Sequence, residues 1–141
     1  MIMLRRLTID DHDAILALWQ RAGLGSRPQG RDNREAFADQ LARGQIVLGL
    51  EDDGRLIACV VITDDTRKGW INRLAVDPDY RRQGLAARLI AEAERELRTR
   101  GIHVFAALIE GENQASLNLF KREGYRTHDI VYVSKRDSAE V

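Results

Sequence analysis

The sequence contains few of the residues that mark several protein classes. It has one cysteine, Cys59, and two prolines among 141 residues. A single thiol excludes an internal disulfide framework and fits a reducing compartment such as the cytoplasm. Cys59 lies inside an apolar run, residues 56–62. We therefore expect it to be a buried core residue and not a nucleophile, because thiols in apolar surroundings stay protonated.

Neither sign of charge is in excess. Lys plus Arg and Asp plus Glu number 22 each, and this balance argues against general nucleic-acid binding, which needs a basic footprint. No apolar run approaches the roughly 18–20 residues of a membrane helix, and the first residues lack the layout of a signal peptide. The three histidines, His12, His103 and His128, do not cluster at metal-ligand spacing, so no metal is expected.

The hydrophobic pattern predicts a single α/β domain over residues 1–141, in the order strand, two helices, three strands, helix, strand, helix and strand. The predicted strands are residues 2–7, 45–50, 55–62, 70–76 and 102–109, followed by one or two closing strands within 125–134. The four predicted helices end at Gly23, near Arg43, at Gly101 and at Gly124.

The most informative stretch is residues 77–86, Asp-Pro-Asp-Tyr-Arg-Arg-Gln-Gly-Leu-Ala, which joins an apolar strand to a strongly amphipathic helix. A strand, a tight basic turn and a helix N-terminus make a cradle for phosphate, because backbone N–H groups and the helix dipole both face the anion. Gly84 has no Cβ, so a ligand can approach the backbone there. The P-loop pattern is absent, and Gly23 and Gly25 lack the third glycine of a dinucleotide fingerprint.

The spacing Arg81-x-x-Gly84-x-Ala86 resembles the pyrophosphate-binding signature of the GNAT acetyltransferases, which has Arg or Gln first and Gly or Ala last. The likeness spans essentially the whole chain, and segments 69–76 and 129–136 are similar to those of the YpeA-like small acetyltransferases of bacteria and archaea. It implies the GNAT fold: a mixed α+β architecture whose mostly antiparallel sheet has six or seven strands, is splayed between the fourth and fifth, and is flanked by four helices.

The resemblance also implies an activity. The chain would be an acetyl-CoA-dependent N-acetyltransferase that transfers the acetyl group to a primary amine of a small molecule or peptide, by direct attack in a ternary complex. Pantetheine would lie along the exposed edge of the fourth strand, and the pyrophosphate would lie on the turn and the helix start. The residues that the resemblance assigns to coenzyme A are Leu74, Ala75, Val76, Arg81, Arg82, Gln83, Gly84, Leu85, Ala86, Ala87, Arg88, Asn113 and Phe120.

The positions that handle protons in the family hold other residues here. The family's tyrosine, a general acid for the departing thiolate, corresponds to Phe120. Its glutamate base, found at one of two places in different members, corresponds to Trp70 or Leu108. None of these three side chains can donate or accept the proton, so other groups must be considered.

Three residues are candidates for that catalytic role. Glu110 follows the fifth strand and would act as a base through water, and Tyr132 lies in a segment that often borders the acceptor pocket. Asn72, expected on one strand face with Trp70 and Leu74, would hold a water. Each also has a purely structural interpretation, as a solvated loop charge, a packing aromatic or a satisfied polar group. We expect that no single side chain is essential and that positioning and water carry the reaction.

Arginines gather in the loop at residues 23–33, beside which the family's acceptor enters. Arg27 and Arg31, with Trp19 nearby, suit a carboxylate or phosphate on the acceptor. Alternatively, these arginines form ion pairs with acidic neighbours in a solvated loop that binds no acceptor.

A second function also stays open, a catalytically weak domain that senses acetyl-CoA or binds a partner. The resemblance further allows a homodimer, because closing strands of such folds often pair across subunits.

Overall fold

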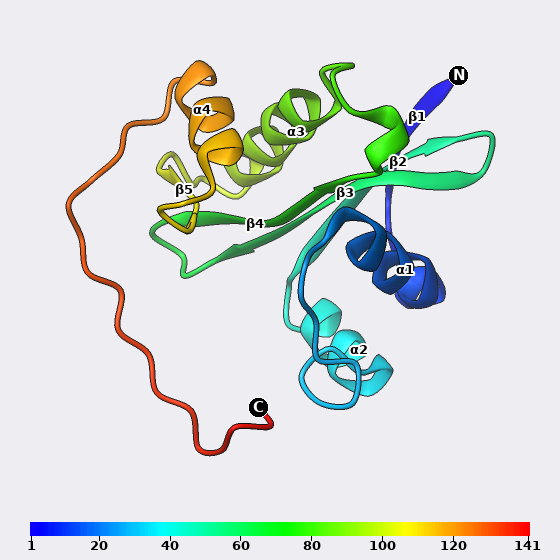
Figure 1. The fold of residues 1–141 in the computed structure, drawn as a ribbon, viewed down its shortest axis with the longest axis horizontal. Helices are drawn as coiled ribbons and strands as arrows, with labels where there is room; N and C mark the ends of the chain where they lie inside the picture. The colour runs from blue at the N-terminus through cyan, green and yellow to red at the C-terminus, as the bar shows by residue number, and fades with distance from the viewer.

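Five strands form one sheet in the order β1-β2-β3-β4-β5 in the computed structural model, which describes residues 1–141 (Figure 1). The strands are β1 Ile2–Arg6, β2 Ile46–Asp52, β3 Arg55–Asp64, β4 Gly69–Val76 and β5 Phe105–Ala106. The helices are α1 His12–Ala22, α2 Arg34–Ala42, α3 Leu85–Thr99 and α4 Gln114–Arg122, with short 3-10 turns η1 Ile9–Asp11 and η2 Pro78–Tyr80. The mixed α+β architecture with four helices is confirmed.

The sheet opens between β4 and β5. The first three strand pairs are antiparallel, whereas β4 and β5 are parallel. Their pairing is limited to Gly69 with Phe105 and Trp70 with Ala106, although the apolar pattern predicts a strand over the whole of 102–109. Beyond Ala106 the two segments diverge and form no further β-ladder. The predicted splay between the fourth and fifth strands is therefore confirmed, and it begins immediately after Trp70.

The prediction of closing strands within residues 125–134 is wrong for the single chain, and the sheet has five strands in place of six or seven. The segment at 126–141 arcs away from β5 and ends beside the loop between α1 and α2, where the Glu140 carbonyl adjoins Gly30 (Figure 1). Ile130 and Val133 are 78 % and 83 % exposed. An apolar pattern favours a strand, but a strand forms only where its backbone finds an edge to pair with.

The sheet separates two apolar clusters. The larger lies between the sheet and α3 and includes Leu89, Ile90 and Leu97, and the smaller lies against α1 and α2. Gly69 lets α3 lie close to β4, because a Cβ added there would be 2.3 Å from Leu97 Cδ1. None of the helices combines the length and the apolar character that a membrane span requires.

Cys59 lies in the middle of β3 and is fully buried. Burial raises the pKa of its thiol to about 12, and Trp19 and the charge of Arg73 oppose this only in part. At pH 8 only about one thiol in 10⁴ is then ionised. We expect iodoacetamide to leave the native protein unlabelled at pH 8 and to label it fully in guanidinium chloride, as mass spectrometry would measure. Stoichiometric labelling of the native protein would contradict this.

Candidate functional site

The turn between β4 and α3 leaves the start of a 15-residue helix without a cap. Arg82 and Gly84 both have left-handed backbones, with φ of 64° and 77°. The N-terminus of α3 has no side-chain cap and no acidic residue in its first turn, so the N–H groups there are free for an anion. A Cβ added at Gly84 would meet no atom within 4 Å. The turn thus combines an open space with unpaired donors at the positive end of a helix dipole.

A buried carboxylate fixes this turn to the rest of the fold. Asp77 is 1 % exposed; its Oδ1 accepts the Asp79 backbone N–H at 2.9 Å. Its Oδ2 accepts hydrogen bonds from Arg21 Nε at 3.0 Å and Arg55 Nη2 at 3.2 Å. The Asp79 N–H, followed by Arg21, holds the pKa of Asp77 below its usual value. The carboxylate therefore joins α1 and β3 to the start of the phosphate turn.

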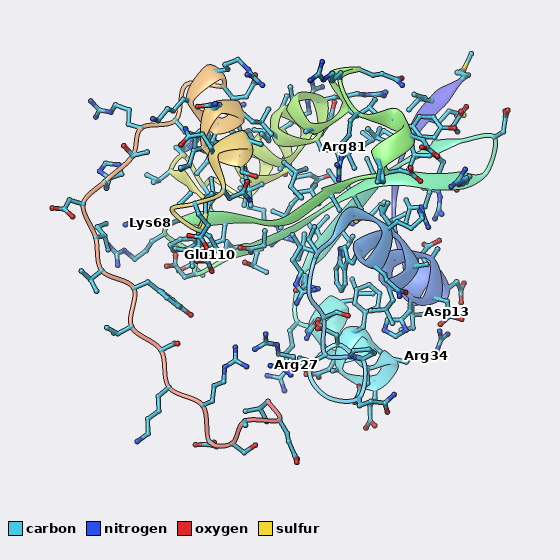
Figure 2. The ribbon with its side chains drawn as sticks, in the orientation of Figure 1. Asp13, Arg27, Arg34, Lys68, Arg81 and Glu110 are labelled. Carbon is cyan, nitrogen blue, oxygen red and sulfur yellow. The ribbon has the colours of Figure 1, made fainter.

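One side chain of the turn anchors it to the sheet, and the basic side chains are exposed to solvent. The Tyr80 hydroxyl donates to Asp52 Oδ2 at 2.8 Å and ties the turn to the end of β2, and this bond raises the pKa of Tyr80. Arg81, Arg82 and Arg88 are exposed, as is Gln83. Figure 2 shows Arg81 at the start of α3, beside the sheet. The basic side chains can therefore reach an anion on the helix N-terminus.

The free edge of β4 presents backbone groups to the gap. The Asp77 N–H donates to the Ile57 carbonyl of β3 at 2.7 Å. Because bonded and non-bonded pairs alternate in an antiparallel ladder, the neighbouring Val76 N–H faces the other, open side. Leu74 and Val76 pack toward α3, whereas Ala75 belongs to the cluster against α1. An extended chain with amide groups could pair with β4 along this edge.

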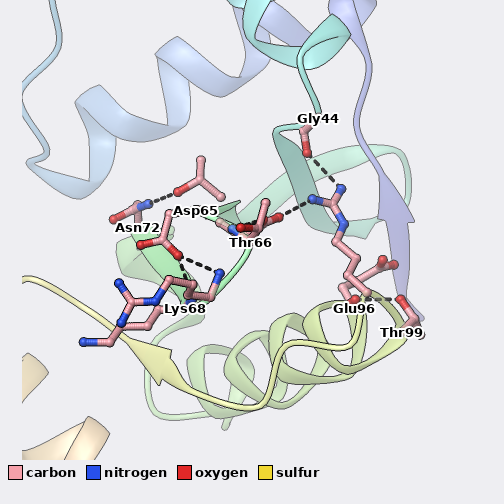
Figure 3. Close-up of polar contacts among 11 residues, drawn as sticks. Gly44, Asp65, Thr66, Lys68, Asn72, Glu96 and Thr99 are labelled. Atoms are coloured by element: carbon pink, nitrogen blue, oxygen red, sulfur yellow. Dashed lines mark hydrogen bonds and ion pairs between the residues drawn. The ribbon is translucent and has the colours of Figure 1, made fainter.

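A bulge in β4 changes which residues share a face. The β3–β4 register shifts here, and Arg73 has a left-handed backbone with φ of 48°. Leu74 consequently packs toward α3, while Asn72 lies on the opposite face and donates to Thr63 Oγ1 at 3.2 Å (Figure 3). The prediction that Asn72, Trp70 and Leu74 share one face is wrong for Leu74, because simple alternation does not survive an extra residue in the strand.

A cavity of about 1000 Å³ lies between the start of β4, β5, α4 and the C-terminal segment. Its wall brings together Glu110, Tyr132 and Phe120 with Trp70 and Leu108. Figure 2 shows Glu110 at this end of the sheet, close to the start of β4. Two of the candidates for proton transfer thus border one space, together with all three positions at which the expected acid and base are missing.

Asn72 and Asn113 lie apart from that cavity wall. Asn72 is absent from it and is already hydrogen-bonded across the sheet. Asn113 caps α4, where its Oδ1 accepts the Ser116 N–H at 3.2 Å. Because the Asn113 side chain is exposed and a cap uses only its oxygen, its NH₂ group remains available to a ligand.

Tyr125 does not replace the missing tyrosine of α4. Its ring meets Phe120 edge-on, with centroids 5.0 Å apart, and its hydroxyl donates to Glu94 Oε2 at 2.6 Å. Burial, and then the bond to Glu94, raise the pKa of Tyr125 well above its usual range. A half-buried hydroxyl already bound to a carboxylate is a poor proton donor to a departing thiolate. Its position favours a structural role, bracing α4 against α3.

Asp32 organises the loop between α1 and α2. Its Oδ2 accepts the Arg27 backbone N–H at 2.6 Å and Arg73 Nη2 at 3.3 Å. The Arg73 guanidinium lies 4.2 Å from the centre of the buried Trp19 ring. The side chains of Arg27 and Arg31 are exposed and form no ion pair. Trp19 is thus beneath Arg73 in the α1 cluster, while the two predicted arginines lie on the surface.

Sequence reasoning missed Arg73 and the pairing of Asp77 with Arg21. A charged residue in a mostly apolar strand is a signal that could have drawn attention to Arg73. No comparable signal links Asp77 to Arg21, because 56 residues separate them and only the fold brings them together. The uncapped start of α3 and the free edge of β4, held in place by Asp77, could accommodate an anion joined to an extended, amide-containing chain.

Comparisons with known proteins agree with this geometry. Residues 12–125 match the acetyltransferase (GNAT) family. An acetyltransferase of Pectobacterium atrosepticum is 28 % identical over 127 residues, covering 90 % of this chain and 89 % of that protein. The PaiA N-acetyltransferase of Thermoplasma acidophilum, in complex with coenzyme A, has a TM-score of 0.82 at 19 % identity over 93 % of each chain. The ribosomal-protein-S18-alanine N-acetyltransferase of Escherichia coli has a TM-score of 0.78 at 24 % identity, over 92 % of this chain and 80 % of that one.

Proposed function

Because the chain belongs to the GNAT acetyltransferase family, we propose that it transfers the acetyl group of acetyl-CoA to a primary amine of a small molecule or peptide. The observation that carries the proposal is the uncapped start of α3 next to the unpaired edge of β4. These two features match two adjoining parts of coenzyme A, its pyrophosphate and its amide-containing arm. We further propose that residues 1–141 act as one domain, in the cytoplasm, which the buried lone thiol fits.

The proposed donor site follows the two structural features in order. The pyrophosphate lies on the backbone from Arg82 to Ala87, and the exposed arginines at 81, 82 and 88 supply charge. Pantetheine pairs with Leu74 and Val76 along the open side of β4, while Ala75 supports the strand from the other face. Asn113 and Phe120 approach this arm from α4.

The reaction requires little covalent help from the protein. The nitrogen lone pair of the neutral amine attacks the thioester carbonyl carbon, the C–S bond breaks, and the electron pair leaves on sulfur. The nitrogen then loses one proton to water. A backbone N–H on the open side of β4, such as that of Val76, would stabilise the developing oxyanion. A thiolate leaves without much protonation, so positioning the two substrates can supply much of the rate.

We expect the three proton-transfer candidates to contribute only modestly. Glu110→Gln, Tyr132→Phe and Asn72→Ala should each lower kcat by less than about tenfold, because removing one member of a water-mediated path leaves others. Steady-state kinetics at saturating acetyl-CoA would measure this. A loss of about 10³-fold in any one variant, with acetyl-CoA binding unchanged, would instead identify that residue as the essential acid or base.

A thiol-release assay tests the activity itself. The protein is incubated with acetyl-CoA and a panel of amines, amino acids and peptides, and free coenzyme A thiol is measured over a no-acceptor control. Thiol release with at least one amine, together with the acetylated product, supports transfer. Tight acetyl-CoA binding without release across the panel favours the second candidate, a sensor or partner-binding domain, for which Phe120 in place of the tyrosine is the specific observation.

The acceptor is proposed to enter on the face of α1 and α2. Arg27 and Arg31 are exposed there, and guanidinium groups favour a carboxylate or phosphate on the acceptor. Trp19 supports the entrance from the core side. An acidic amine is therefore the preferred substrate class within this proposal.

We also propose that the protein forms a homodimer through its C-terminal segment. Residues 130–133 are all at least 69 % exposed, and the outer side of β5 has no strand partner. The edge at 103–112 carries Glu110 and Glu112 without a lysine or arginine, whereas the segment at 126–136 contains Arg126, Lys135 and Arg136 against a single acidic residue, Asp129.

Cysteine crosslinking distinguishes this dimer from pairing within one chain. Leu108→Cys protein is mixed with Ile130→Cys, Val131→Cys or Val133→Cys protein under mild oxidation, with unmodified protein as the control for Cys59. Disulfide-linked dimers between the two variants support the proposal. A double variant that closes only within its own chain, in a protein that sediments as a monomer, would refute it.

A further inference from the structure

Arg73 lies where the donor side of β4 meets the acceptor side of the sheet. It directly precedes Leu74, on the part of β4 that pairs with β3 but no longer with β5. Its left-handed backbone, with φ of 48°, is uncommon for a non-glycine residue inside a strand and costs free energy. The bulge turns the long side chain onto the face of α1, against Trp19. Strain of this kind persists where the resulting geometry is used.

The guanidinium of Arg73 has fewer partners than its burial demands. Its contact with Asp32 is a single bond of 3.3 Å from Nη2, and the same Asp32 oxygen accepts a shorter bond of 2.6 Å from the Arg27 backbone. Nη1 of Arg73 is buried and has no hydrogen-bond partner. Of the two buried side-chain donors that lack one, Trp19 Nε1 is adjacent to the Cys59 thiol, so only Arg73 has charge to offer a ligand.

We propose that Arg73 binds the carboxylate of the acceptor, and that Asp32 holds this place until the acceptor arrives. This inference rests on the proposed function and narrows its substrate class to amines that carry a carboxylate, such as amino acids. Arg73 and Asp32 side chains are 26 % and 11 % exposed. When the Asp32 loop moves outward, a free carboxylate can form the two-bond fork with Nη1 and Nη2 that Asp32 does not form.

Three features of the contact favour this assignment. The group already beside Arg73 is a carboxylate, so the surroundings accommodate that geometry. The Trp19 ring holds the guanidinium plane from the other side. The position next to Leu74 places the acceptor's charged end near the proposed thioester, so its amine can reach the carbonyl carbon. No phosphate-like group lies beside Arg73, so inorganic phosphate is included in the test as a comparison ligand.

The two partners should respond in opposite directions. Arg73→Gln should raise KM for an amino acid about tenfold or more and leave KM for the matching carboxamide within about twofold, because only the acid uses the fork. Asp32→Asn should lower KM for the acid about threefold or more, because a neutral amide competes less for Arg73. Arg73→Lys, which keeps the charge but not the fork, should be intermediate. Arg31→Gln measures the contribution of the surface arginines, and Arg6→Gln, at an exposed arginine of β1, is the control.

A purely structural ion pair predicts otherwise, since both variants would then weaken activity toward acid and amide alike. Equal KM effects on the two acceptors, or a larger selective effect from Arg31→Gln than from Arg73→Gln, would overturn the inference while leaving acetyl transfer intact.

Trp19 fluorescence provides a readout that needs no turnover. In a Trp70→Phe background Trp19 is the single indole of the chain. We expect a saturable change on titration with L-alanine or L-glutamate in the presence of coenzyme A, no change with L-alaninamide, and none with Arg73→Gln. This response without thiol release would refute the proposed transfer but support the carboxylate site. A response to inorganic phosphate alone, or to none of these probes, would refute the site.

Discussion

Replacing Gly84 by aspartate should weaken acetyl-CoA binding about 100-fold, while replacing it by asparagine should weaken binding only a few-fold. Aspartate and asparagine tolerate a left-handed backbone better than other non-glycine residues. Each should therefore lower the free energy of unfolding by a similar, small amount at φ of 77°. Only aspartate places a negative charge beside the uncapped start of α3. Repulsion of about 2–3 kcal/mol between that charge and a phosphate corresponds to a loss of about 100-fold.

Isothermal titration with acetyl-CoA and with desulfo-coenzyme A would measure these affinities, and a thermal melt would verify that both variants fold alike. The difference between the two variants should shrink at high salt, because the repulsion is partly screened. Similar affinities for the aspartate and asparagine variants would place the pyrophosphate away from α3.

Asp77→Asn should lower the free energy of unfolding by about 2–3 kcal/mol, since hydrogen bonds to charged groups contribute about that much. For a domain of this size the midpoint of thermal unfolding should fall by about 5–10 °C. The exposed neighbour Asp79→Asn is the matched control and should change little. KM for acetyl-CoA should also rise several-fold in Asp77→Asn, because the carboxylate fixes the phosphate turn to α1 and β3. An unchanged melt in urea and heat would contradict this anchoring role.

The same carboxylate makes stability depend on pH. The Asp79 N–H and Arg21 lower the pKa of Asp77 in the folded state, relative to about 3.9 in the unfolded chain. Its stabilisation is therefore fully present above about pH 4 and is lost as pH falls through the lower folded-state pKa. Urea unfolding between pH 3 and 7 should show a steeper acid loss for the unmodified protein than for Asp77→Asn. If the free energy of unfolding fell equally with pH in both proteins, Asp77 would not be a source of the pH dependence.

Much of the fold could be predicted because its signals are local. A few consecutive residues are enough to predict the apolar periodicity of α3, the Asn33 cap of α2 and the glycine that ends α1. The segment at 125–134 is different. Its strand pattern is as clear as that of β3, but pairing depends on an edge that must be brought to it, and the single chain leaves it unpaired.

For the candidate site, sequence patterns predicted the local geometry of the turn before α3. A strand, a basic turn and Gly84 identify an anion cradle from ten residues. The acceptor side could not be predicted in the same way, because the bulge at Arg73 and the contact with Asp32 depend on the register between β3 and β4 and on a loop 41 residues away. Alternation grouped Leu74 with Asn72 on one face, which is wrong for the same reason. Contacts between distant segments are what local patterns cannot specify.

The division of the core into two clusters has a consequence for the divergence of such proteins. The cluster against α3 supports the strand edge and the helix start, and the cluster against α1 and α2 supports the loop with Asp32. Substitutions in separate clusters share few neighbours and should act nearly independently. Under the proposed function, residues on the acceptor face could therefore change while those on the donor face are retained. A TM-score of 0.82 at 19 % identity shows that the fold itself persists when most residues differ.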